Sequence, residues 1–184
     1  MSDFRRNFVS GGTYFFTCVT YQRQPILTSD LARRCLRHSI EKVQRRFPFA
    51  AIATVLLPDH WHTVWQLPEA DSRYPLRWRR IKEEFTRSWL MEGGRELEQT
   101  MSRKTHRHRG VWQKRYWEHT VRDERDLKKC VDYIHWNPRK HGLVSKVADW
   151  QWSSFHRFVA AGEYTATWGN VDPAPGWNAP EWGE

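Results

Sequence analysis

The stretch from Phe49 to Leu67 constrains the fold most, because two strand-like runs flank a Pro58-Asp59 pair. Proline and aspartate favour a tight turn, so we expect the two runs to form an antiparallel hairpin. Side chains alternate between the faces of a strand, which places His60 and His62 on the same side, about 7 Å apart along the backbone. The hairpin therefore predicts a pair of neighbouring imidazoles on a rigid element.

This histidine pair is a candidate metal site. Two imidazoles on one strand can bind a divalent cation when a third ligand comes from elsewhere in the chain. A His-x-His pattern alone reflects packing or chance more often than metal binding. On these residues alone, both interpretations stay open.

The composition favours a polyanionic partner. The formal net charge is +9, and aromatic residues make up 15% of the chain, with 12 Trp among them. Cationic side chains pair with phosphates and aromatic rings stack on bases, so nucleic acid is favoured and many rings are expected near the surface. An anionic membrane surface is the competing partner, but we expect neither a spanning segment nor a secretory leader.

The three cysteines are Cys18, Cys35 and Cys130. Their spacing fits no zinc motif, and an odd number argues against a disulfide framework. We therefore expect each to be a small core residue of a protein in a reducing cytosol.

The other elements follow from periodicity and helix-end signals. We expect a strand at 13–21, a helix at 31–47 ended by Pro48, a helix at 74–91, a strand within 111–121, and a helix from 122 that Pro138 closes. Residues 1–161 are predicted to form one domain. The basic segment 93–110 is expected to be a mobile loop, and 162–184 a poorly ordered tail with aromatic anchors.

This order predicts an α+β fold of the ferredoxin-like split βαβ type. One antiparallel sheet would carry helices on one face, plus an added C-terminal helix that bears Tyr133. Tyr133 and Asn137 are four residues apart and so share a helix face, from which they can reach His60 and His62. Tyr116 is a rival nucleophile, although no metal-ligand candidate lies beside it at helical spacing. Asn137 can instead simply cap the helix end.

Several motifs, in order, resemble one family. They are Arg5-Arg6 with 11–17 (GGTYFFT), 57–62 (LPDHWH), 112–119 (WQ to WEH), 131–138 (VDYIHWNP) and 140–142 (KHG). Together they resemble the REP-associated tyrosine transposases, a domesticated branch of the single-tyrosine HUH (His-hydrophobe-His) insertion-sequence transposases. The segment 93–110 and the tail lie outside this resemblance.

The resemblance implies cleavage of single-stranded DNA at REP sequences, which are short palindromic hairpins preceded by a conserved tetranucleotide. It implies that Tyr133 is the nucleophile and that His60, His62 and Asn137 bind one Mg²⁺ or Mn²⁺ ion. Attack by Tyr133 would leave a phosphotyrosine bond and a free hydroxyl, so that rejoining needs no nucleotide cofactor. Two imidazoles favour Mn²⁺ over Mg²⁺, and Zn²⁺ stays open.

We also expect a set of cationic side chains to hold the DNA. It comprises Arg5, Arg6, Arg77, Arg79, Arg80, Lys82, Arg115 and Lys140. The resemblance favours a monomer, with a dimer left open, in the nucleoid of a bacterial cytoplasm. Two alternatives remain: a protein that binds hairpin DNA without chemistry, and a metal hydrolase that uses water in place of Tyr133.

Overall fold

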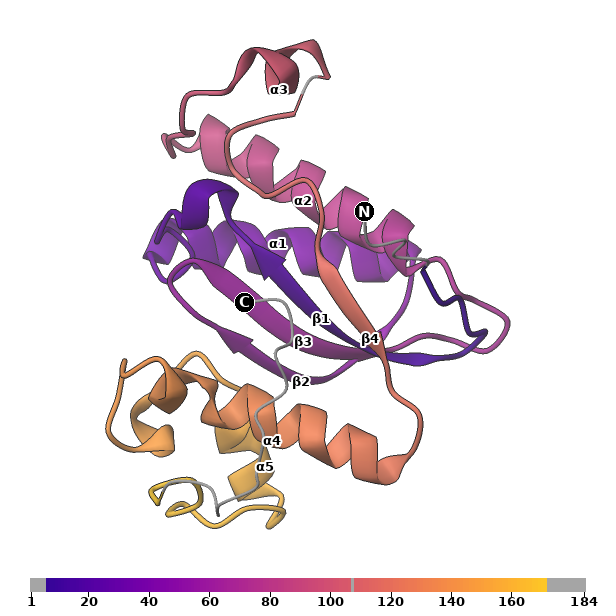
Figure 1. The fold of residues 1–184 in the computed structure, drawn as a ribbon, viewed down its shortest axis with the longest axis vertical. Coiled ribbons are helices and arrows are strands. Elements are labelled where there is room, and N and C mark those ends of the chain that lie inside the picture. The colour runs from indigo at the N-terminus through magenta and orange to yellow at the C-terminus, as the bar shows by residue number, and fades with distance from the viewer. Residues whose placement is uncertain (1–5, 107, 172–184) are drawn as a thin grey trace.

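A four-stranded antiparallel sheet forms the centre of the protein in the computed structural model, which describes residues 6–106 and 108–171 (Figure 1). Its strands are β1 (Thr13–Val19), β2 (Ala50–Leu56), β3 (His60–Gln66) and β4 (Trp117–Thr120), arranged in the order β2-β3-β1-β4. The predicted hairpin is confirmed, because β2 pairs antiparallel with β3. β1 pairs with both β3 and β4, so β3 and β1 lie at the middle of the sheet and β2 and β4 at its edges.

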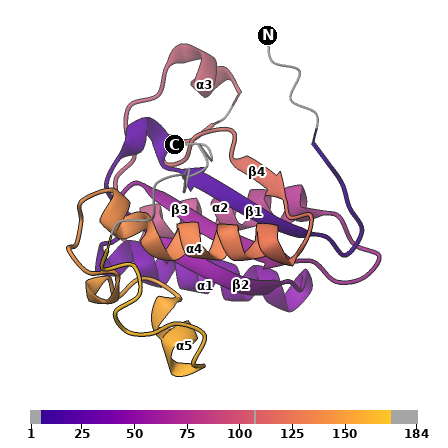
Figure 2. The ribbon, with the colours of Figure 1, turned by 60° about the horizontal axis from the view of Figure 1, so that its bottom comes forward.

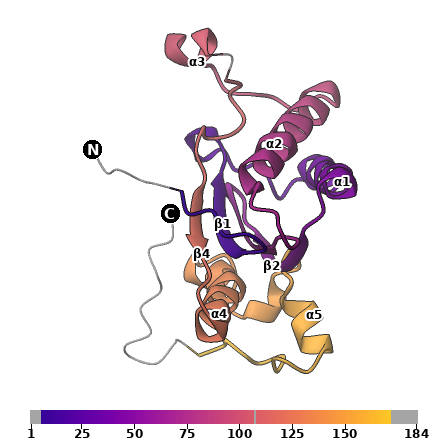
Figure 3. The same cartoon turned by 90° about the vertical axis from the view of Figure 1, so that its right-hand side faces the viewer.

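Two long helices, α1 (Asp30–Arg46) and α2 (Tyr74–Met91), lie side by side on one face of the sheet (Figures 1 and 3). α1 begins where the Ser29 hydroxyl accepts a hydrogen bond from the Ala32 N–H, which satisfies one of the unpaired donors of the first turn. Pro75 occupies the first turn of α2, where its missing N–H costs nothing.

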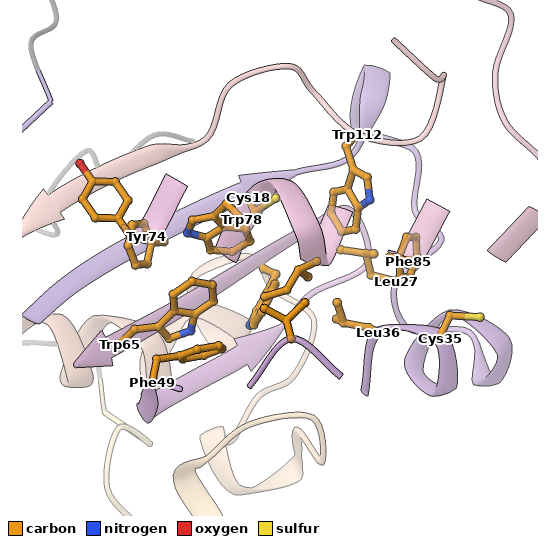
Figure 4. Close-up of a cluster of buried hydrophobic side chains, with 14 of the residues drawn as sticks. Cys18, Leu27, Cys35, Leu36, Phe49, Trp65, Tyr74, Trp78, Phe85 and Trp112 are labelled. Carbon is orange, nitrogen blue, oxygen red and sulfur yellow. The ribbon is translucent and has the colours of Figure 1, made fainter. Parts of the chain in front are cut away.

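An aromatic core fills the space between these helices and the sheet (Figure 4). Trp65 of β3 stacks on Trp78 of α2 with ring centroids 4.5 Å apart. Many rings were expected near the surface. Among the described residues, Phe8 is the only aromatic residue among the exposed large hydrophobic ones, while others such as Tyr116 and Trp152 are half-buried. Large rings contribute much of the core's volume; the buried tryptophans are Trp61, Trp65, Trp78, Trp89, Trp112 and Trp150. All three cysteines are free and buried, as predicted.

The opposite face of the sheet is covered by α4 (Glu124–Lys140) and the short α5 (Phe155–Ala160) (Figures 2 and 3). The start of α4 is fixed by its own side chains: Asp123 accepts from the Asp126 N–H at 2.8 Å. The Asp126 carboxylate in turn accepts from Nε2 of His119 on β4 at 2.9 Å. The predicted α+β class, with two helices on one face and an added helix carrying Tyr133, is confirmed.

Three details differ from the sequence analysis. α4 does not end at Pro138 but runs two residues further, to Lys140. A proline removes only its own backbone donor and crowds the preceding turn, which need not end a helix. β4 is shorter than predicted, and Trp112 makes only an isolated bridge with Thr20. The segment 93–110 contains a short helix, α3 (Met101–Thr105), and an ion pair in which Arg109 binds Glu96 at 2.6 Å.

Beyond α5, the described part of the predicted tail packs on α4. Tyr164 donates a hydrogen bond to the Asp132 carboxylate, and Trp168 lies 4.7 Å from Tyr164 between ring centroids. Two single turns of 3-10 helix, Tyr21–Arg23 and Val147–Asp149, complete the secondary structure that is described. Within the described ranges, no helix combines the length and the apolar character that a membrane span requires.

Candidate active site

His60 and His62 lie side by side on β3, on the sheet face that α4 covers. Both side chains are almost fully buried, and their ring centroids are 4.8 Å apart. The alternation of the strand sends Trp61 and Trp65 into the core on the other face, so that the histidines and Val64 face α4. The predicted pairing of the two imidazoles is therefore present.

Each imidazole is oriented by a neighbour through Nδ1. His60 Nδ1 lies 2.6 Å from Asp59 Oδ1, and His62 Nδ1 lies 2.9 Å from the hydroxyl of Thr17 on β1. Burial opposes ionisation of Asp59, but the hydrogen bonds from His60 and Arg23 hold the pKa of its carboxyl at about 2. A carboxylate that accepts from one ring nitrogen of a histidine fixes the tautomer in which the other nitrogen can bind a metal.

The second ring nitrogen of His60 shows whether the histidine pair is suited to bind a metal ion. His60 Nε2 is buried and has no hydrogen-bond partner among the described residues. A buried polar nitrogen without a partner is costly, and a cation would satisfy it. The donor set fits a divalent ion that accepts imidazole ligands.

Tyr133 reaches this pair from α4. Its ring centroid is 5.4 Å from that of His62, and its side chain is fully buried. Lys140 Nζ, two turns later on the same helix, donates to the Tyr133 hydroxyl at 3.1 Å. An ammonium at this distance favours the ionised form of a phenol, which is the better nucleophile.

Asn137 and His141 continue the same helix face. Asn137 is fully buried, one turn after Tyr133, which places it on the side of α4 that faces the sheet. The His141 ring lies 5.1 Å from the His60 ring between centroids. Sequence reasoning gave His141 no role, although its spacing of four residues from Asn137 and eight from Tyr133 was a usable signal.

The rival nucleophile Tyr116 lies on the other face of the sheet. Its ring stacks on Trp78 of α2 at 5.3 Å between centroids, and its hydroxyl accepts from Arg6. Burial raises the pKa of this phenol, with Arg6 opposing the effect. Tyr116 is therefore separated from the histidine pair by the sheet itself.

The structure contradicts one of the predicted DNA-binding residues. Arg77 is fully buried, and its guanidinium binds Asp71 through two nitrogens at 3.1 and 3.0 Å. It also donates to the backbone oxygens of Phe47 and Pro48. Because these partners occupy the guanidinium, Arg77 supports the loop between α1 and β2, and its assignment to DNA is corrected.

The other predicted cations that are described fall into separate groups. Arg6, Arg79 and Lys82 line a common groove. Arg80 and Arg115 are exposed and do not line this groove, and Lys140 donates to the Tyr133 hydroxyl on the other face of the sheet. Arg5 falls outside the described residues.

The groove is bounded by α2 and by the chain that leads into β4, and has a cavity volume of about 690 Å³. Its cationic side chains outnumber the single carboxylate, Glu83. They are Arg6, Arg79, Lys82, Arg87, Arg103, Arg109 and Lys114. Sequence reasoning predicted a mobile basic loop at 93–110 but missed that its cations meet Arg87 of α2 in this groove. That meeting depends on how the segment folds back, which periodicity does not report.

The chain is similar to known proteins both in sequence and in fold. A family model described as "Transposase IS200 like" matches residues 8–137. A REP-associated tyrosine transposase of Escherichia coli K12 is 41% identical over 169 residues, which is 91% of each chain. A relative from Haemophilus influenzae, described as the same kind of transposase, is 42% identical over 92% of this chain and 94% of its own.

A solved structure of a REP-associated tyrosine transposase bound to a REP hairpin is also similar, with a TM-score of 0.78 and 41% identity. The similarity covers 95% of this chain and 96% of that chain. The likeness therefore extends over nearly the whole of both chains. On these comparisons, the chain belongs to the REP-associated tyrosine transposases, within the IS200-like transposase family.

Proposed function

We propose that this protein nicks and rejoins single-stranded DNA at REP-like hairpins, with Tyr133 as the nucleophile and one divalent cation as cofactor. The observation that carries the proposal is the contact between Tyr133 on α4 and His62 on β3, whose ring centroids are 5.4 Å apart. The two residues are distant in sequence, and the fold brings a phenol to an imidazole pair that suits a cation.

The proposed reaction is a transesterification. The Tyr133 oxygen attacks a phosphorus atom of the DNA, its proton passes to solvent, and a P–O bond to tyrosine forms. The bond from phosphorus to one deoxyribose oxygen breaks, and that oxygen takes up a proton. The number of phosphodiester bonds is conserved, so the reverse reaction rejoins the strand without another source of energy.

The chain's own residues would prepare the reacting groups. Lys140 holds the Tyr133 hydroxyl at 3.1 Å and favours its ionised form. Asp59 and Thr17 fix the rings of His60 and His62, which with Asn137 are the proposed ligands. A bound Mn²⁺ or Mg²⁺ ion would supply positive charge to the phosphate oxygens. Because α4 packs on its own sheet, a single chain would complete the site.

The basic groove is the proposed holding surface for the DNA. Its clustered cations suit phosphate binding, and a related chain of 41% identity was solved with a REP hairpin bound. The groove lies on the α2 side of the sheet, whereas Tyr133 lies on the α4 side. A bound strand would therefore pass around the β4 edge to reach the nucleophile.

The direct test uses labelled hairpin DNA with a single-stranded extension, incubated with Mn²⁺. Native protein should form a covalent adduct that survives denaturing electrophoresis. Tyr133→Phe should form none while binding the hairpin with unchanged affinity, and Tyr116→Phe is the matched control that keeps the adduct. An adduct of normal yield in Tyr133→Phe would remove this residue from its role.

The alternative is a protein that binds hairpin DNA without chemistry. It is favoured by the position of the basic groove, which lies on the sheet face opposite Tyr133. Binding that a chelator leaves unchanged, with no cleavage under Mn²⁺, Mg²⁺ or Zn²⁺, would establish this function. Cleavage without a protein-linked product would instead identify water as the nucleophile.

A further inference from the structure

A buried carboxylate lies at the edge of the basic groove and takes no part in the proposed chemistry. Glu118 of β4 has a side chain that is only 4% exposed. Its Oε1 accepts from the Tyr74 hydroxyl at 3.3 Å, whereas its Oε2 has no hydrogen-bond partner among the described residues. A buried carboxylate oxygen without a donor is costly, which indicates that a group other than the described residues supplies one.

Arg6 connects this carboxylate to the groove. Its Nε lies 3.6 Å from Glu118 Oε1, and its guanidinium lies 4.6 Å from the centroid of the Tyr116 ring. Arg6 and Tyr116 both line the groove. The Arg6 side chain is 32% exposed and belongs to no helix or strand, so a ligand that offers donors to Glu118 and Tyr116 in its place can displace it. Displacement of Arg6 would join Glu118 to the groove.

Tyr116 offers a flat surface beside this opening. Its ring is backed by Trp78, which stacks on it at an interplanar angle of 26°. An aromatic ring fixed in this way is a platform on which an unpaired base can stack.

The charge of Glu118 determines what the opening would accept. A carboxylate repels phosphate, so a groove that served the DNA backbone alone has no use for one. Burial raises the pKa of this carboxyl, while Arg6 and the hydrogen bond from Tyr74 oppose the rise. A carboxylate oxygen accepts from N–H donors, and cytosine, adenine and guanine carry exocyclic amino groups that can donate.

We infer that Glu118 reads an unpaired base that bears an amino group, and that the opening at Arg6 and Tyr116 discriminates against thymine and uracil. The inference rests on the proposed function, because it assumes that DNA occupies the groove. Thymine and uracil carry a carbonyl oxygen where cytosine has its amino group. Their one donor on this edge, N3–H, lies between two carbonyl oxygens, both of which repel a carboxylate that approaches it. In a duplex the amino groups are already paired, so the base must be single-stranded.

The test measures hairpin affinity by fluorescence anisotropy at one fixed salt concentration, with EDTA present so that no strand is cut. The hairpins carry a single-stranded extension of deoxycytidine or of deoxyuridine, which differ only at the base edge. Native protein should bind the deoxycytidine form about tenfold more tightly. In Glu118→Gln the preference should fall to within twofold, because an amide both accepts and donates.

Glu83→Gln is the matched control, since it removes a carboxylate that lines the same groove but is 53% exposed. It should keep the preference for deoxycytidine. The inference is overturned if the native protein binds both hairpins equally, or if Glu83→Gln loses the preference as Glu118→Gln does. If Glu118→Gln does not fold, the comparison of the two hairpins on native protein still decides. Failure to bind any hairpin would contradict the proposed function instead.

Discussion

The replacement Asp59→Asn tests how the protein prepares His60 for a cation. Asn keeps the size of the side chain and the backbone contacts of the β2–β3 turn, but it removes the negative charge that lies 2.6 Å from His60 Nδ1. Without that charge, the tautomer with a lone pair on Nε2 loses its preference. We expect weaker binding of Mn²⁺ with an unchanged fold.

The structure gives the size of this effect. The pKa of Asp59 is about 2, compared with 3.8 for an ordinary aspartate. At about 1.4 kcal/mol per pKa unit, the surrounding donors, His60 and Arg23, favour the carboxylate by about 2.5 kcal/mol after the opposing effect of burial. Loss of such an outer partner typically lowers metal affinity by about 10- to 100-fold, which is about 1.4 to 2.7 kcal/mol.

The assay is a Mn²⁺ titration without DNA, in which electron paramagnetic resonance measures the free ion. Asp59→Asn should raise the Kd by about 10- to 100-fold. Arg23→Gln is the control, because Arg23 also pairs with Asp59 but does not touch His60; its effect should be below threefold. Equal affinities for Asp59→Asn and native protein would refute the proposed orientation of His60.

Three further results are expected. Lys140→Ala should slow adduct formation by about tenfold or more, since it removes a charged hydrogen bond to Tyr133. Its hairpin affinity should stay within twofold of native, and Lys140→Arg should recover part of the rate. A drop in hairpin affinity alone would make Lys140 a DNA contact only. Arg77→Ala should lower the free energy of unfolding in urea by about 3–5 kcal/mol, as expected for a broken buried ion pair, whereas the exposed Arg79→Ala should change it by less than about 0.5 kcal/mol. Burial, helped by nearby cations, lowers the pKa of His135 to about 3, so the contribution of the neutral imidazole to stability is complete above pH of about 6.5 and is lost as the pH falls toward 3. Between pH 7 and 4.5 we expect the free energy of unfolding to fall by roughly 2–3 kcal/mol, a loss that is absent in His135→Gln. Parallel pH profiles for the two proteins would contradict this.

Local patterns predicted most of the elements because their signals lie within a few residues. α2 runs over the predicted residues 74–91, and the alternation on β3 predicted the shared face of His60 and His62. The residues alone allowed a contact between Tyr133 and His62 but did not predict it, because the contact depends on which face of the sheet α4 covers. The resemblance to a family, rather than the residues, indicated that the contact forms.

The errors have physical causes. Arg77 was assigned to the surface by its charge, yet it falls between Tyr74 and Trp78 on the apolar stripe of α2, where a partner such as Asp71 makes burial tolerable. The tryptophans were expected at the surface because composition cannot tell a stacking platform from a core. The basic groove combines an arm, a helix and a loop, and no single stretch of sequence carries that arrangement.

The central claim is that Tyr133, and not another hydroxyl, becomes joined to DNA. The most direct measurement is mass spectrometry of peptides from the denatured adduct formed with Mn²⁺ and hairpin DNA. The account predicts a nucleotide attached to the peptide that contains Tyr133, at that residue. Attachment at Tyr116 or any other residue, or cleaved DNA with no modified peptide, would contradict it.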